Sequence, residues 1–154
     1  MNKKIVAVLS LMFVMTCALF AQSKKDVEIG GFKMTIPSDW LTIEGKDALK
    51  WTVLSPDGMY NGNLVVETLP ATMTVEEYLE ATRDLLESAY EVNFTEKGKD
   101  YHIIDLAMQG IVVREIQFVQ IRGKDVYVVT FGTLKDNFNK SLDTFKSIYR
   151  SLKF

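Results

Sequence analysis

The side chains that could carry out chemistry in this chain are few and widely spaced. His102 is the only histidine, and Asp100 and Asp105 lie near it in the segment DYHIID. A zinc site needs three or four ligands, usually histidine and cysteine together, whereas Cys17 is the only cysteine. We therefore interpret His102 as a structural or surface histidine, and we predict neither a metal centre nor a cofactor.

Carboxylates are concentrated in the segment TMTVEEYLEATRDLLESAY, at Glu76, Glu77, Glu80, Asp84 and Glu87. Paired carboxylates can act as general acid and base. At helical spacing, these residues instead fall on the polar side of an amphipathic helix. Arg83 lies three residues after Glu80 and four before Glu87, which is the spacing of surface ion pairs. We interpret the group as a solvated helix face, with contact to a basic partner surface as the alternative.

The segment SPDGMYNGN contains oxygen ligands at Asp57, Asn61 and Asn63. Their spacing does not match a calcium-binding loop, and no acidic residue closes it. The glycines that follow Asp57 and Asn61 are typical of turns. We predict a turn whose tip exposes Met59 and Tyr60 as contact residues.

Other chemistry has little support in the sequence. It contains neither a G-x-S-x-G nucleophile elbow nor a glycine-rich phosphate loop. The triplets at Asn93 and Asn139 fit the glycosylation sequon, which arises often by chance. Aromatic residues could line an apolar pocket between sheet and helix, although we favour a core role for Trp51. The candidates are Phe32, Trp40, Trp51, Tyr60 and Tyr101.

The first residues have the pattern of a secretory signal peptide. Two lysines precede residues 5–21, which carry no charge and end in a small residue. We predict cleavage after Ala21, with residues 22–154 forming one exported domain that is periplasmic or secreted. Lipidation at Cys17 is one alternative, although Thr16 is a poor match just before a lipoprotein cysteine. An uncut membrane anchor is the other.

Charge excludes some partners of the mature domain. The chain has 18 basic and 20 acidic residues, and loss of the two lysines in the export segment makes it more acidic still. Mild acidity argues against nucleic-acid binding, which needs a basic patch, and against attachment to anionic lipid. If Cys17 is removed with the signal, neither a disulfide nor thiol chemistry remains, and packing alone must hold the fold.

The elements that must position these residues follow the order strands, helix, strands, helix. Alternating or apolar runs predict strands within residues 30–40, two within 48–70, and three within 100–134. Thr74 and Glu77 form a capping box at the start of the first helix. Its predicted apolar stripe is Val75, Tyr78, Leu79, Thr82, Leu85, Leu86 and Ala89. The closing helix directs these residues inward: Phe138, Leu142, Phe145, Ile148, Tyr149 and Leu152.

Short turns between the last three strands, such as RGKD, imply antiparallel pairing. Helices that alternate with groups of strands favour an α+β fold, with an antiparallel sheet flanked by helices as an αβα sandwich. The mature chain shows no internal repeat or linker, so we predict a single domain.

Several segments resemble one known family across nearly the whole mature chain. FKMTIPSDW resembles its opening strand, TVLSPDGMYNGNLVVETLP its Ser-Pro loop between two strands, and MTVEEYLEATRDLL its first long helix. VYVVTFGTLKDNFNKSLDTFKSIYRSLKF resembles its closing strand and helix. The family is the Mog1/PsbP-like superfamily, which includes bacterial envelope proteins of the DcrB type. The resemblance implies an antiparallel sheet between helices, protein-binding or accessory roles, and no shared catalytic residues.

The sequence therefore favours an exported, non-enzymatic binding or accessory domain that engages another envelope protein. The contact would be an edge strand of the sheet or the loop at Met59 and Tyr60. The alternative is a carrier of a small apolar ligand. A hydrolase built around His102 is the weakest hypothesis, and we predict no catalytic, cofactor-binding or metal-binding residues.

Overall fold

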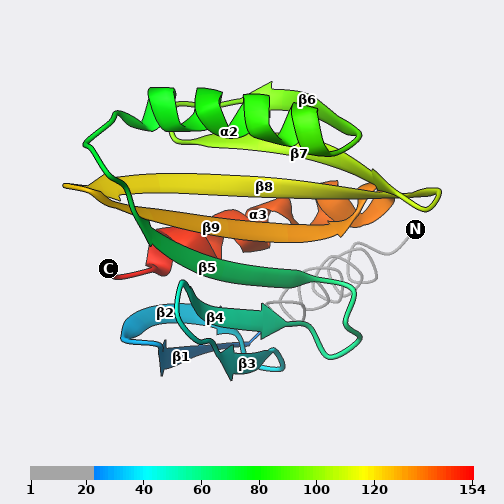
Figure 1. Cartoon of the computed structure of the whole chain (residues 1–154). Helices are drawn as coiled ribbons and strands as arrows, with labels where there is room; N and C mark the ends of the chain where they lie inside the picture. Colours follow the sequence, from blue (N-terminus) through cyan, green and yellow to red (C-terminus); the bar gives the residue numbers. More distant parts are fainter. Residues whose placement is uncertain (1–22) are drawn as a thin grey trace, which may run out of the picture.

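The computed structural model describes residues 23–154, which fold into two helices and two antiparallel sheets (Figure 1). The predicted export segment, with Cys17 and the cleavage after Ala21, lies outside the described residues. The strands are β1 (Lys24–Ile29), β2 (Phe32–Pro37), β3 (Leu41–Glu44), β4 (Leu49–Leu54), β5 (Asn61–Thr68), β6 (Val92–Lys97), β7 (Tyr101–Met108), β8 (Ile111–Arg122) and β9 (Asp125–Leu134). The helices are α2 (Val75–Ala89) and α3 (Lys135–Ser151).

The larger sheet has seven strands in the order β3-β4-β5-β9-β8-β7-β6, and every neighbouring pair is antiparallel. The predicted α+β class and the antiparallel pairing of the last three strands are confirmed. The turn in RGKD joins β8 to β9, where Gly123 has a φ of 64°. A positive φ carries little strain at glycine, so this turn brings the two long central strands into register.

Three strands were not predicted: β1, β3 and β6. β1 pairs with β2 as a separate hairpin around Gly30 and Gly31, whose φ angles are 59° and 83°. Two adjacent glycines between alternating segments are a hairpin signal, so this strand could have been found. β3 and β6 form the two edges of the large sheet, where partial burial leaves a weaker hydrophobic alternation.

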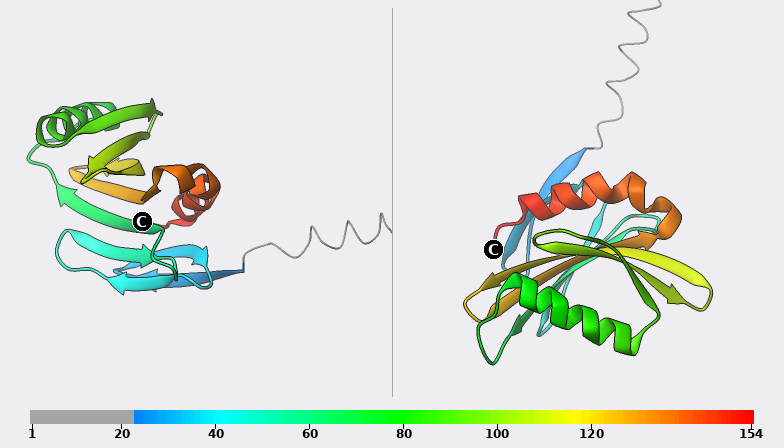
Figure 2. Two further views of the ribbon diagram at one scale, coloured as in Figure 1. Left: turned by 90° about the vertical axis from the view of Figure 1, so that its right-hand side faces the viewer. Right: turned by 90° about the horizontal axis from the view of Figure 1, so that it is seen from above.

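Helix α3 covers one face of the large sheet, and the hairpin β1–β2 packs along the same helix (Figure 2). Four of its six predicted inward residues are buried: Phe138, Phe145, Ile148 and Leu152. Phe145 stacks on Phe131 with ring centroids 5.1 Å apart, and Tyr149 stacks on Phe118 at 4.0 Å. Aromatic stacking adds to the free energy gained from apolar burial, so this side is the main core.

Helix α2 lies over part of the opposite face (Figure 2). The capping box of Thr74 and Glu77 is confirmed. The predicted apolar stripe is only partly right, because Leu79 is its one fully buried member and Leu85 is 67% exposed. Leu79 packs with Val119 and Val126, so the burial is concentrated in the first half of α2. Among residues 23–154, neither helix is long and apolar enough to span a membrane.

Candidate binding surface

Strand pairing distributes the side chains of the sheet between two contrasting faces. Residues paired in register project to the same side of a sheet, and successive residues alternate between sides. On the side of α3, a row across five strands is entirely hydrophobic or aromatic: Trp51, Leu64, Val129, Phe118 and Tyr101. The adjacent row on the other side is polar throughout: Thr52, Asn63, Thr130, Gln117 and His102.

A second row on the polar side runs beside the first. Asn61 pairs with Gly132, which pairs with Glu115. We call six residues of these two rows the open face: Thr52, Asn61, Asn63, Glu115, Gln117 and Thr130. Each of them is exposed or partly exposed, because the buried contacts of α2 are made with Val119 and Val126 and not with these six residues. The open face is thus a polar, solvent-accessible patch at the middle of the sheet.

The β3 edge extends the same side of the sheet with apolar residues. Leu41 pairs with Leu54, and Ile43 pairs with Thr52, so both β3 residues project beside the open face. Leu41 is 60% exposed and Ile43 is 51% exposed. Exposed apolar residues next to a polar patch are a common composition of protein-binding surfaces.

His102 is a buried structural histidine, as one of the two sequence interpretations expected. Its Nε2 donates to Gln117 Oε1 (2.8 Å), and its ring packs edge-on against Phe94 at 5.0 Å. Burial lowers the pKa of His102 below its ordinary value, which favours the neutral ring. Within residues 23–154, no cluster of three or more histidine, cysteine or acidic side chains could hold a metal ion.

Glu115 is the only charged member of the open face. Its single hydrogen bond comes from Gln117 Nε2 (3.3 Å), and it forms no ion pair with any described lysine or arginine. Burial raises the pKa of Glu115 above its ordinary value. The Glu115 side chain lies across the neighbouring Gly132, where a Cβ would be only 3.1 Å from Glu115 Cγ.

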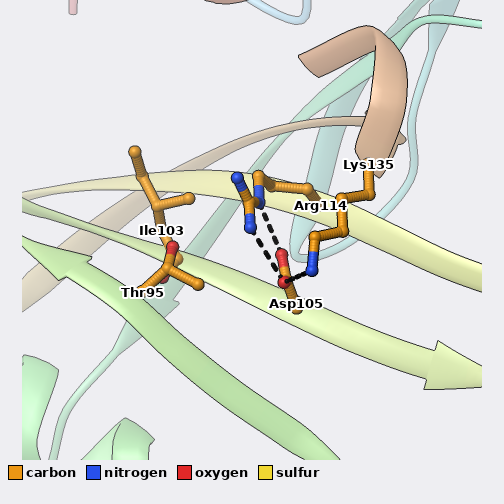
Figure 3. Close-up of polar contacts among 5 residues, drawn as sticks. All are labelled: Thr95, Ile103, Asp105, Arg114 and Lys135. Atoms are coloured by element: carbon orange, nitrogen blue, oxygen red, sulfur yellow. Dashed lines mark hydrogen bonds and ion pairs between the residues drawn. The ribbon is translucent and has the colours of Figure 1, made fainter. Parts of the chain in front are cut away.

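Asp105 lies on the α3 side and has the opposite environment (Figure 3). The Arg114 guanidinium donates two hydrogen bonds to its carboxylate (2.5 and 2.9 Å), and Lys135 Nζ lies 2.9 Å away. These cations, Arg114 first, hold the pKa of Asp105 below its usual range. The cluster joins β7, β8 and the start of α3. Strand alternation separates Asp105 from His102, so the sequence proximity of the two residues does not make a site.

The acidic residues of α2 are exposed, as the sequence interpretation expected. Arg83 pairs with Glu87 (2.9 Å) and lies 4.9 Å from the Phe94 ring centroid. The spacing-based pair between Arg83 and Glu80 does not form. Glu77 serves the helix cap, where hydrogen bonds from Thr74 lower its pKa. These carboxylates form a solvated helix face.

The turn predicted at SPDGMYNGN is confirmed. Asp57 Oδ1 accepts from Ser55 Oγ (2.5 Å) and from the Met59 backbone N–H (3.0 Å), and these bonds lower its pKa. Met59 is 40% exposed, as expected. The prediction for Tyr60 is wrong: its ring stacks on Trp40 at 6.4 Å and is only partly exposed. The tip of the loop therefore offers one exposed apolar contact residue, not two.

The five aromatic pocket candidates do not meet around one cavity. Trp51 is fully buried in the core, as we favoured, and the Tyr101 hydroxyl donates to Glu96 Oε1 (2.5 Å). Only Trp40 and Tyr60 border a common cleft, of about 390 Å³. The other residues lining it are mostly polar: Asp39, Ser55, Pro56, Asp57, Lys140, Ser141 and Thr144. The predicted apolar pocket is therefore replaced by a smaller aromatic corner in a polar cleft.

The sequence interpretation did not single out the open face. One signal was present, since the alternation of β8 places Glu115 and Gln117 on the same side as Val113 and Val119. A charged residue and an amide between two valines mark a side that is apolar only at its ends. Asn63 and Thr130 gave no such signal, because only the pairing of β5 with β9 brings them beside Gln117.

Comparison with known proteins identifies the fold. No protein-family model matches the chain, and no curated protein matches its sequence. Similar solved structures include cyanobacterial PsbP from Synechocystis sp. PCC 6803, with 10% identity, a TM-score of 0.52 and coverage of 88% of this chain and 95% of that one. They also include LpqN of Mycobacterium tuberculosis, described as involved in cell envelope biogenesis, with 12% identity, a TM-score of 0.58 and coverage of 85% of this chain and 90% of that one. A third is the Ran-binding protein Mog1p of Saccharomyces cerevisiae, with 12% identity, a TM-score of 0.58 and coverage of 86% of this chain and 96% of that one.

These proteins are similar to this chain over most of their length and define its class as an α+β domain. The chain has the Mog1/PsbP-like fold, as the sequence resemblance predicted. At this level of identity the similarity concerns the arrangement of the backbone, so functional residues have to be argued from this chain itself.

Proposed function

We propose that residues 22–154 form an exported accessory domain without catalytic activity, which binds another protein of the cell envelope through the open face. The observation that carries this proposal is the open face itself. It is a polar, accessible patch in the middle of a sheet whose other side is a closed core. A covering partner would bury it together with the exposed Leu41 and Ile43 of β3.

Two further observations support the proposal. The N-terminal pattern of lysines followed by an uncharged run favours export. Among the structural neighbours, one is described as Ran-binding and another as involved in cell envelope biogenesis, so this fold occurs in a binding protein and in an envelope protein.

A pair of matched variants tests the contact surface. Three tagged proteins are used for affinity capture from the native envelope fraction. They are the wild type, Asn63→Arg on the open face, and Asn139→Arg on the exposed side of α3. We expect a saturable envelope protein to be captured by wild type and Asn139→Arg but lost with Asn63→Arg. Equal capture by all three would refute the open face as the contact surface.

The same preparation tests export. A mature protein whose intact mass begins at Gln22 would match cleavage after Ala21. A mass that retains a lipid-modified Cys17 would instead assign the protein to the lipoproteins, and an uncut chain would support the anchor.

The cleft beside Trp40 and Tyr60 supports a second candidate, a carrier of a small ligand. Its aromatic corner and polar walls suit a compound with both apolar and hydrogen-bonding groups. Native mass spectrometry of the purified protein would show a retained compound, which Thr144→Trp should displace by filling the cleft. Absence of any retained compound, together with loss of capture in Asn63→Arg, would exclude the carrier in favour of the accessory domain.

A further inference from the structure

The carboxylate of Glu115 lacks a counter-ion within the described part of the chain. Its two neighbours in the row are Gly132 and Ile104, both uncharged, and its one hydrogen bond comes from the neutral amide of Gln117. His102, at the other end of that amide, is buried and favours its neutral form. The local environment therefore supplies no cation to Glu115.

This arrangement is unfavourable for the isolated domain. A carboxylate that is partly removed from water and receives no charged hydrogen bond is destabilised in its ionised form. Asp105, one strand away on the other side, has an arginine and a lysine in contact. Asp105, on the side of the sheet covered by α3, is thus neutralised by cations. Glu115, on the open face, is not.

The row that contains Glu115 is accessible to a partner beyond Gly132. The Glu115 side chain lies across Gly132, and Asn61, the next residue of the row, is exposed. The amide oxygens of Asn61 and Gln117 are hydrogen-bond acceptors. Beyond Asn61, the row continues to Leu54 and to the exposed Leu41. The carboxylate of Glu115 is thereby followed, along the row, by the apolar side chains of Leu54 and Leu41.

We propose that the open face binds a protein segment that places an arginine, or less favourably a lysine, against Glu115 while an apolar side chain packs on Leu41 and Leu54. This deepens the proposed function and rests on it. Arginine fits best because its planar guanidinium pairs with a carboxylate through two parallel hydrogen bonds and can donate to neighbouring amides. Pairing in a partly dehydrated site is stronger than at an exposed surface.

The test uses two synthetic peptide pools of the form Leu-X-Arg-X-Leu and Leu-X-citrulline-X-Leu, where X is any uncharged residue. Citrulline keeps the shape of arginine without its charge. Binding is measured by chemical-shift changes of the backbone amides in wild type, Glu115→Gln and the control Glu28→Gln, an exposed carboxylate on β1. We expect about tenfold tighter binding of the arginine pool to wild type and to the control. In Glu115→Gln this preference should disappear, and the shifts should centre on Asn61, Gln117 and Thr130.

Each other outcome overturns the inference. Equal binding of both pools, binding of neither, or shifts confined to the cleft at Trp40 would each contradict an arginine at Glu115. A concentration-dependent dimer that shields the open face would assign that face to a second copy of the chain. The proposed function can hold when this inference fails: if envelope capture is lost in Asn63→Arg but unchanged in Glu115→Gln, the partner binds the open face without using this carboxylate. Equal capture by wild type, Asn63→Arg and Asn139→Arg would instead refute the proposed function.

Discussion

The two sides of the seven-stranded sheet use the same strands but differ in what covers them. On one side, α3 and the hairpin β1–β2 enclose a core of stacked aromatic rings. On the other side, α2 buries a small cluster around Leu79, and the middle of the sheet stays polar and accessible. Two carboxylates follow the same division: Asp105 is held by two cations, whereas Glu115 has none.

This difference separates residues that hold the fold from residues that are available for binding. Burial of aromatic and aliphatic side chains on the α3 side supplies most of the free energy of folding. The open side contributes less and tolerates an uncompensated charge, which is common where stability is given up for function. Mutations on the two sides should therefore have effects of different size and, at the two carboxylates, of different sign.

The largest effect is expected from Phe145→Ala on the α3 side. Phe145 is fully buried and contacts Phe131, Phe138 and Tyr60, so truncation leaves a cavity among rings that cannot close it. The free energy of unfolding should fall by about 4 kcal/mol, as measured by denaturant unfolding. A loss below about 1 kcal/mol would show that the α3 side is not the main core.

Asp105→Asn should be the next most damaging change. It removes the charge that holds Arg114 and Lys135, with an expected loss of about 2 kcal/mol at neutral pH. Because the pKa of Asp105 is lowered in the folded protein, the unfolded chain takes up its proton first, and the stabilisation is lost as pH falls below about 4. As the pH is lowered, the free energy of unfolding should decline less steeply in the variant than in wild type. Equal pH dependence in the two proteins would refute the stabilising role of the Asp105 carboxylate.

Glu115→Gln should have the opposite sign. The folded pKa is raised, so between about 4.5 and that value the folded protein binds more protons, and wild-type stability falls as pH rises through this range. The variant lacks this decline and should be more stable at neutral pH by about 1 kcal/mol. Urea unfolding at neutral and at acidic pH measures both effects. A loss of stability at neutral pH would mean that Glu115 belongs to the structural framework.

Leu85→Ala on α2 should have the smallest effect on the free energy of unfolding. The side chain is 67% exposed although the helical spacing placed it in the apolar stripe. Its truncation should change the free energy of unfolding by less than about 0.5 kcal/mol, while Leu79→Ala, in the buried cluster of the same helix, should cost about 2 kcal/mol. Equal losses in thermal or urea unfolding would show that α2 is buried along its whole length.

Features that depend on interactions between nearby residues could be predicted from the sequence. The capping box of Thr74, the turn at Asp57 and the inward side of α3 depend on residues close together in the chain, and all three are confirmed. The Mog1/PsbP-like fold could also be predicted, because its core and turn pattern extends over residues 30–154.

Features that depend on tertiary packing or on strand pairing could not be predicted. The exposure of Leu85 follows from where α2 rests on the sheet, and the partial burial of Tyr60 follows from its stacking on Trp40. The open face requires β5 to lie beside β9, two strands more than fifty residues apart in the chain. A sequence pattern gives the side of each strand but not its neighbour, so the polar rows became visible only in the folded sheet.

The most direct test of the account is photo-cross-linking in the native envelope. A photoreactive benzoylphenylalanine is placed at position 63 on the open face or at position 139 on the exposed side of α3, and cross-linked products are identified by mass. We predict one reproducible envelope protein cross-linked from position 63 and none from position 139. Cross-linking only from position 139, or equally from both, would contradict the claim that the open face of the sheet is the binding surface.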